Sequence, residues 1–182
     1  MAKVLEISTA IGCPIRCSFC PQKAIAAAYD GPRLLDLPTF DAAIINTPPG
    51  IEVVFAGFAE PFLNRDAAEF IRCAAASGHP VEVYTTGVGM TCADVDVMVA
   101  SGVHSTTLHL ADADGNAKIN VTDEYVAAVV YAQSWLPNLR VMTMGTIHPK
   151  LFPHFGQPDP VAMHSRAGNV IDGVASVAHS GP

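Results

Sequence analysis

The sequence alternates short segments typical of strands with segments typical of helices, and this alternation most restricts the folds open to it. The strand-like segments are rich in valine and threonine. We expect strands over residues 3–9, 51–57, 80–86, 103–111 and 138–145. Strands that alternate with helices favour a parallel sheet with helical crossovers.

The segments between these strands carry helix signals. We expect helices over residues 23–29, 39–46, 64–78, 91–102 and 122–135. Threonine is a favoured cap at a helix N-terminus. The expected cap residues are Thr39, Thr91 and Thr122.

The length of the chain decides between a closed and an open arrangement of these units. A closed barrel of eight strand–helix units usually needs about 250 residues, and this chain has 182. A sixth strand over 162–171 would bring the total to about six units. We therefore predict an open, partial parallel β/α barrel that forms a single domain over residues 1–182. The proline-rich residues 147–160 are expected to form a loop.

Composition excludes several classes of protein. Half of the residues are hydrophobic and 15% are charged, which suits a folded core and not a disordered chain. The net charge is −7 and no basic run occurs, so a general nucleic-acid or anionic-membrane surface is not expected. No stretch approaches the ~20 apolar residues of a membrane span, and Glu6 interrupts the apolar run near the N-terminus. We expect a cytoplasmic protein.

The segment "IGCPIRCSFCPQ", residues 11–22, contains three of the five cysteines with the spacing C-x3-C-x2-C. These are Cys13, Cys17 and Cys20. Clustered thiolates bind soft metals, such as zinc, copper(I) or an iron–sulfur cluster. A structural zinc site normally has four ligands, and the fourth would have to be Cys73, Cys92 or a histidine. Both of those cysteines lie in helical segments, where a partly buried core thiol is the ordinary interpretation.

This spacing, with Phe19 directly before the third cysteine, resembles the signature of the radical S-adenosylmethionine (SAM) enzymes. The resemblance implies that the three thiolates hold a [4Fe–4S] cluster, whose fourth iron binds the amino and carboxylate groups of SAM. It also implies reductive cleavage of SAM to methionine and a 5′-deoxyadenosyl radical, which abstracts a hydrogen atom from a substrate. An electron donor such as flavodoxin or ferredoxin is the partner that this chemistry needs.

Two further segments resemble parts of the same family. "FAGFAEPFLN", residues 55–64, is similar to the Gly-Gly-Glu-Pro segment that receives the SAM ammonium, with Ala59 in place of the second glycine. "YTTGVGM", residues 84–90, lies where the family often has Thr-Asn-Gly, and "LHLADADGN" ends the fourth strand. By this resemblance the SAM-binding residues are Gly57, Ala59, Glu60 and Pro61. The residues expected to line the ribose or substrate side are Thr85, Thr86, His109 and Asp112.

The segment "HSRAGN", residues 164–169, resembles one that precedes the C-terminal SPASM extension in peptide- and protein-modifying members of the family. Arg166 in this segment is expected to pair with a carboxylate. No cysteine follows Asn169, so the chain is expected to be a core domain without that extension, truncated or completed by a region supplied elsewhere. The alternative to a region supplied elsewhere is a large substrate, such as a peptide or a protein.

Two classes of function therefore remain open from the sequence. The first is a radical SAM enzyme, and the second is a non-catalytic iron–sulfur or zinc-binding protein derived from the same fold. The Glu60 segment separates them, because a pure metal-binding module has no need of it. A third interpretation, a nucleotide-binding glycine loop at residues 87–92, is disfavoured because Cys92 occupies the place of the third glycine. The identity of the substrate is set by loop detail that the sequence does not reveal.

Overall fold

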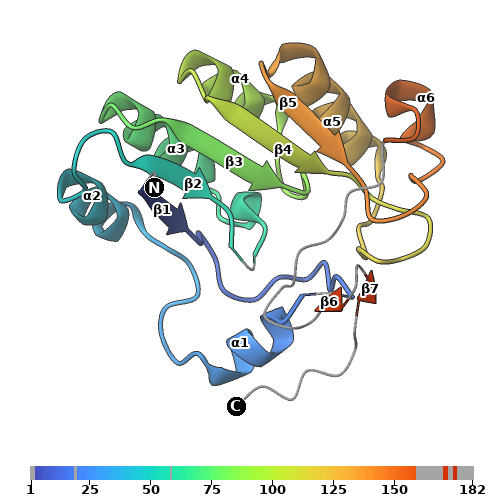
Figure 1. The fold of residues 1–182 in the computed structure, drawn as a ribbon, viewed down its shortest axis with the longest axis horizontal. Helices are drawn as coiled ribbons and strands as arrows, with labels where there is room; N and C mark the ends of the chain where they lie inside the picture. The colour runs from blue at the N-terminus through green and yellow to red at the C-terminus, as the bar shows by residue number, and fades with distance from the viewer. Residues whose placement is uncertain (1–2, 19, 58, 159–169, 172–173, 176–182) are drawn as a thin grey trace.

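The computed structural model describes residues 3–18, 20–57, 59–158, 170–171 and 174–175. Five parallel strands form one open sheet in the order β1-β2-β3-β4-β5 (Figure 1). The strands are β1 (Val4–Ile7), β2 (Glu52–Phe55), β3 (Val81–Thr85), β4 (Ser105–His109) and β5 (Leu139–Met142). All five lie within the segments predicted as strands, and the predicted open, parallel α/β arrangement is confirmed.

Helices connect the strands and cover one face of the sheet. Four of them, α2 to α5, pack behind the sheet as neighbours of one another (Figure 1). The helical elements are α1 (Gln22–Ala28), α2 (Leu37–Ile45), the 3₁₀ turn η1 (Pro61–Leu63), α3 (Ala67–Ala76), α4 (Cys92–Ala100), α5 (Asp123–Trp135) and α6 (Phe152–Phe155). Because every connection in the sheet is a crossover, all five carboxyl ends meet at one edge.

The core lies between the sheet and these helices. Side chains of a strand point alternately to the two faces, and in β2 the fully buried Val53 and Phe55 belong to the core. Phe40 of α2 contacts Phe55 and Phe70 of α3, with ring centroids 6.0 and 4.8 Å apart. The alternate residues, such as Glu52 and Val54, point to the opposite face, which is the inner face of a partial barrel.

The predicted helix starts are confirmed for two helices and wrong for one. Thr91 accepts a hydrogen bond from the backbone N–H of Asp94 and forms a capping box with it, and Thr122 caps α5. Helix α2 is capped by Asp36, whose carboxylate accepts the N–H of Thr39 at 2.8 Å, and not by Thr39 itself. The reason is that Pro38 belongs inside the first turn, where its missing N–H would have had no helical partner.

The remaining predictions concern the C-terminal third of the chain. The predicted loop over 147–160 contains the short helix α6, and its last two residues lie outside the described part. The predicted sixth strand over 162–171 also falls mostly outside it. Its last two residues form β6 (Val170–Ile171), which pairs antiparallel with β7 (Val174–Ala175) and is not part of the five-stranded sheet. Within the described residues, no helix has both the length and the apolar character needed to cross a membrane.

Phe70→Ala should lower the free energy of unfolding by about 3–5 kcal/mol, because it removes a fully buried ring from the centre of the core. Urea titration measures this effect. Phe152→Ala is the matched control, since the Phe152 side chain is 55% exposed and its loss should change stability by less than about 1 kcal/mol. Equal effects of the two substitutions would contradict the assignment of the core.

Candidate functional site

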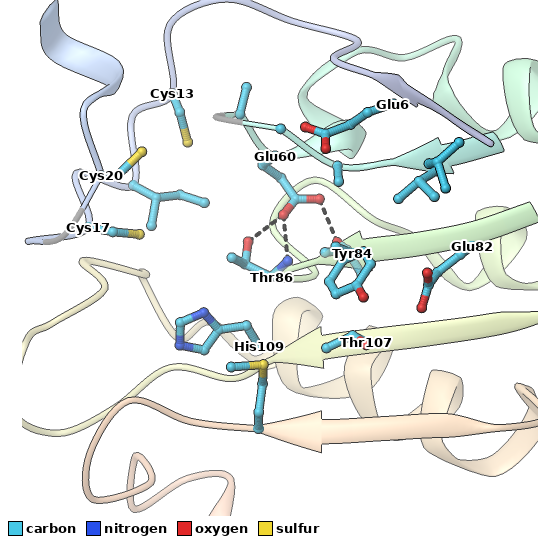
Figure 2. Close-up of a pocket in the computed structure, with 18 of the residues that line it drawn as sticks. Glu6, Cys13, Cys17, Cys20, Glu60, Glu82, Tyr84, Thr86, Thr107 and His109 are labelled. Carbon is cyan, nitrogen blue, oxygen red and sulfur yellow. Dashed lines mark hydrogen bonds between the residues drawn. The ribbon is translucent and has the colours of Figure 1, made fainter. Parts of the chain in front are cut away.

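A cavity of about 560 Å³ opens on the inner face of the sheet, toward the carboxyl ends of its strands. Figure 2 shows the loop that carries the cysteines on one side of this cavity, facing the tips of β3 and β4. Most of the predicted site residues line it. They are Cys13, Cys17, Cys20, Gly57, Ala59, Glu60, Thr85, Thr86 and His109.

The three clustered cysteines lie on the loop that leaves β1. Each is partly buried, and none of the five cysteines, all of which lie among the described residues, forms a disulfide. Gly12, directly before Cys13, has a φ of +94°, and Arg16 also has a positive φ, of 51°. These left-handed residues bend the backbone sharply. The N–H of Cys20 then donates to the carbonyl of Cys17 at 3.1 Å. The loop therefore folds back on itself, and its three thiols line one cavity.

Glu60 is the best-connected side chain of the cavity. It is 3% exposed, and it caps the 3₁₀ turn η1 through the N–H of Phe62, at 3.2 Å. The hydroxyl of Thr85 donates to the same oxygen, Oε1, at 2.5 Å. The second oxygen, Oε2, accepts the N–H and the hydroxyl of Thr86, at 2.5 and 2.6 Å. Figure 2 shows this carboxylate between the loop after β2 and the end of β3.

These four donors and the burial act on the Glu60 carboxyl in opposite directions. Burial disfavours the charged form and raises its pKa above the ordinary value of 4.5, while the hydrogen bonds favour the charged form and oppose the shift. Each of the two oxygens faces a backbone N–H, from Phe62 or from Thr86. A backbone N–H cannot reverse its direction, so only a group with two accepting oxygens satisfies both sides.

Two buried polar side chains join the loop after β1 to the loop that carries Glu60. The hydroxyl of Thr9 donates to the carbonyl of Pro61 at 2.8 Å. The amide of Asn64 donates to the carbonyls of Thr9 and Leu35, at 2.9 and 2.8 Å. Pro61 thus lies in this junction, buried and outside the set of cavity-lining residues. Because the junction fixes the cysteine loop's first residues against the Glu60 loop, it sets the two halves of the cavity relative to each other.

Position 57 requires a residue without a side chain, which is glycine. Its φ is +94°, and a Cβ at this position would lie 2.0 Å from the hydroxyl of Ser8. The next loop residue predicted to bind SAM, Ala59, also lines the cavity and is partly buried.

The other predicted site residues take different positions. Asp112 is buried but does not line the cavity, because its carboxylate turns back to accept hydrogen bonds from Asn116 and Ala117 in its own loop. The structure therefore does not place Asp112 with Thr85, Thr86 and His109 in the cavity lining. Phe19 and Arg166 lie outside the described residues.

Comparison with known families agrees with this geometry. Residues 7–143 match the model of the radical SAM superfamily, and this range runs from the last residue of β1 to the end of β5 and includes all the cavity-lining residues except Val4 and Glu6. The chain belongs to the radical SAM superfamily.

One solved structure supports the fold of this radical SAM domain. The crystal structure of BtrN in complex with AdoMet and 2-DOIA aligns with a TM-score of 0.53 at 11% sequence identity, over 79% of this chain and 57% of BtrN. A selenomethionine BtrN structure in an open conformation aligns with a TM-score of 0.49 at 11% identity, over 79% of this chain and 56% of that chain. This chain thus spans little more than half the length of BtrN. A search of curated proteins found no match.

The sequence reasoning missed the part of the cavity that lies along the strands. Its lining there includes polar and apolar strand residues, among them Glu6, Glu52, Glu82, Tyr84, Thr107 and Met142. The register aligns Tyr84 with Thr107, and the hydroxyl of Ser105 donates to Glu82 at 2.9 Å. The signal was present in "VEVYT", where polar residues alternate with buried valines. Such alternation marks a strand with one polar face.

Glu60→Gln should change how the stability of the cofactor-free protein depends on pH. Because the folded pKa of Glu60 is raised above 4.5, the unfolded chain ionises first as the pH rises. Wild-type stability relative to the variant should therefore fall as the pH rises from about 4.5 through the raised folded pKa. Urea titrations of both proteins across this range measure the difference.

Glu69→Gln serves as the control with the opposite sign. Glu69 is paired with Arg72 on the surface of α3, and this pairing lowers its pKa. The small stabilisation that the ionised Glu69 carboxylate gives the folded protein should be present above pH 4.5 and should be lost as the pH falls. If the stability of the wild type relative to Glu60→Gln rises with pH, the pKa of Glu60 is not raised.

Proposed function

We propose that this chain is the core of a radical SAM enzyme, which binds a [4Fe–4S] cluster through Cys13, Cys17 and Cys20 and binds SAM beside it. The observation that carries the proposal is that the three thiols and the Glu60 loop line one cavity at the carboxyl ends of a parallel sheet. In barrels of this kind the loops at that end build the active site. When bound, the cluster would supply the electron for reductive cleavage of SAM, and hydrogen abstraction from the substrate would follow.

The donor set fits an iron–sulfur cluster better than a single zinc ion. Thiolates are the usual ligands of such clusters. Among the described residues, no three histidine, cysteine, aspartate or glutamate side chains are grouped closely enough to hold one metal ion. Three thiols that line one cavity would supply three of the ligands of such a cluster.

The opposite wall of the cavity fits the amino acid part of SAM. A buried carboxylate at Glu60 favours a nearby ammonium group, and such a charge-assisted contact is stronger in a site that excludes water. An ammonium would also offset the burial that raises the pKa of Glu60. The cavity volume of about 560 Å³ lies within the range of ordinary cofactor pockets. Ala59, Gly57 and Pro61 shape the loop, and His109 with the Thr85–Thr86 pair lies on the ribose or substrate side.

The proposal extends to the substrate and partners as follows. A peptide or protein is the proposed substrate, supported by the resemblance of residues 164–169 to SPASM-type members and by the open inner face of a five-stranded sheet. Arg166 is proposed to pair with a carboxylate of the substrate or of SAM. The electron donor is proposed to be a flavodoxin or a ferredoxin.

Anaerobic reconstitution should load about four irons and four sulfides per chain. Cys13→Ala, Cys17→Ala and Cys20→Ala should each abolish or strongly reduce this loading, as measured by iron and sulfide analysis. Cys73→Ala and Cys92→Ala are the matched controls and should load like the wild type, because neither lines the cavity. Loss of the cluster in a control variant, with retention in Cys17→Ala, would overturn the ligand assignment.

The loaded protein should cleave SAM slowly under dithionite without added substrate, and chromatography should detect 5′-deoxyadenosine. Glu60→Ala should reduce this yield at least about tenfold, because it removes the carboxylate proposed to hold the ammonium. Glu69→Gln should retain the wild-type yield. A fully loaded cluster that yields no 5′-deoxyadenosine would favour the non-catalytic iron–sulfur alternative.

A further inference from the structure

The loop after β4 has an internal organisation that the proposed SAM site does not use. Asp112 is 5% exposed, and its carboxylate accepts three hydrogen bonds. Oδ1 accepts the backbone N–H of Asn116 at 2.8 Å and its side-chain amide at 3.2 Å, while Oδ2 accepts the N–H of Ala117 at 3.0 Å. Aspartate closes turns in this way because its short side chain reaches backbone donors a few residues ahead.

The closed turn contacts the cysteine loop through its backbone. The carbonyl of Asn116 accepts the N–H of Ser18 at 2.8 Å, and the N–H of Lys118 donates to the carbonyl of Ile15 at 3.0 Å. Ser18 lies between Cys17 and Cys20, and the buried Ile15 lies between Cys13 and Cys17. The two hydrogen bonds therefore reach both intervals between the three thiols.

The same turn is anchored to the fold on its other side. The N–H of Ala113 donates to the carbonyl of Thr146 at 2.7 Å, and the N–H of His148 donates to the carbonyl of Ala111 at 3.0 Å. The carboxylate of Asp114 accepts the N–H of Thr146 at 2.7 Å. The turn thus connects the end of the sheet to the cysteine loop, with Asp112 directed toward one side and Asp114 toward the other.

We propose that Asp112 is a positioning residue for the cysteine loop. Its carboxylate holds Asn116 and Ala117 so that the flanking backbone groups bind Ser18 and Ile15, and it thereby sets the spacing of the three thiols. That these thiols hold the cluster rests on the proposed function, whereas the effect on the loop does not. Both carboxylate oxygens face a backbone N–H, so an asparagine accepts only one of the two bonds.

The test compares Asp112→Asn with Asp114→Asn, a matched control two residues away whose carboxylate binds the opposite loop. In the reduced, cluster-free protein, Asp112→Asn should speed amide hydrogen exchange in residues 13–20 by about five- to tenfold, the effect expected of one lost hydrogen bond. Asp114→Asn should leave exchange in residues 13–20 at the wild-type rate. Unchanged exchange of residues 13–20 in a folded Asp112→Asn would overturn the proposal.

A second readout uses the reconstituted protein. Asp112→Asn should lose its cluster to a chelator faster than the wild type and should alter the visible circular dichroism of the cluster, which reports the arrangement of its ligands. Asp114→Asn should match the wild type in both. Wild-type retention and dichroism in Asp112→Asn would also contradict the proposal. If even the wild-type chain takes up no cluster, the proposed function fails, and the exchange comparison still decides the role of Asp112.

A milder variant covers the case in which Asp112→Asn does not fold. Asn116→Ala removes only the 3.2 Å bond from its side-chain amide to Asp112 and keeps the backbone groups in place. It should speed exchange in residues 13–20 by a smaller factor than that expected for Asp112→Asn. Wild-type exchange throughout residues 13–20 in this variant would then overturn the proposal.

Discussion

Parallel pairing of the five strands is the constraint on which the rest of the structure depends. Because every strand runs in the same direction, the loop after β1, the loop after β2 and the ends of β3 and β4 all lie at one edge. The cysteines, Glu60 and His109 come from positions far apart in the sequence, and this single feature brings them to one cavity. A sheet with one antiparallel strand would send one of these groups to the opposite edge.

Within that edge, the Glu60 carboxylate is the central contact. It connects the loop after β2 to Thr85 and Thr86 at the end of β3, and Asn64 and Thr9 connect the same loop to the chain after β1. A buried charge with four donors is stable only where each donor is held in place. The same contacts that satisfy the carboxylate therefore fix the wall of the cavity opposite the three thiols.

More of the fold than of the site could be predicted from the sequence. The alternation of strands and helices predicted all five strands of the sheet, since β-branched residues and helix caps give strong local signals. The predicted N-terminal cap of α2 was Thr39 and the observed cap is Asp36, because Pro38 was taken to precede the helix and in fact lies in its first turn. The sequence suggested roles for Cys13, Glu60 and Thr86 only through a resemblance to a family. The contacts of these residues depend on which strands are neighbours in the sheet, and that is seen only in the structure. Asp112 does not line the cavity in the structure, and "DADGN" is typical of a turn that an aspartate closes on itself.

The central claim is that one cavity holds a cluster on three thiolates and leaves one iron for the amino acid part of SAM. Electron–nuclear double resonance of the reduced, reconstituted protein with SAM labelled with ¹⁵N at its amino group tests it directly. The account predicts a ¹⁵N coupling to the cluster that is present in the wild type and weakened or lost in Glu60→Ala. A loaded, reduced cluster that shows no such coupling, in a sample where equilibrium dialysis demonstrates bound SAM, would contradict it.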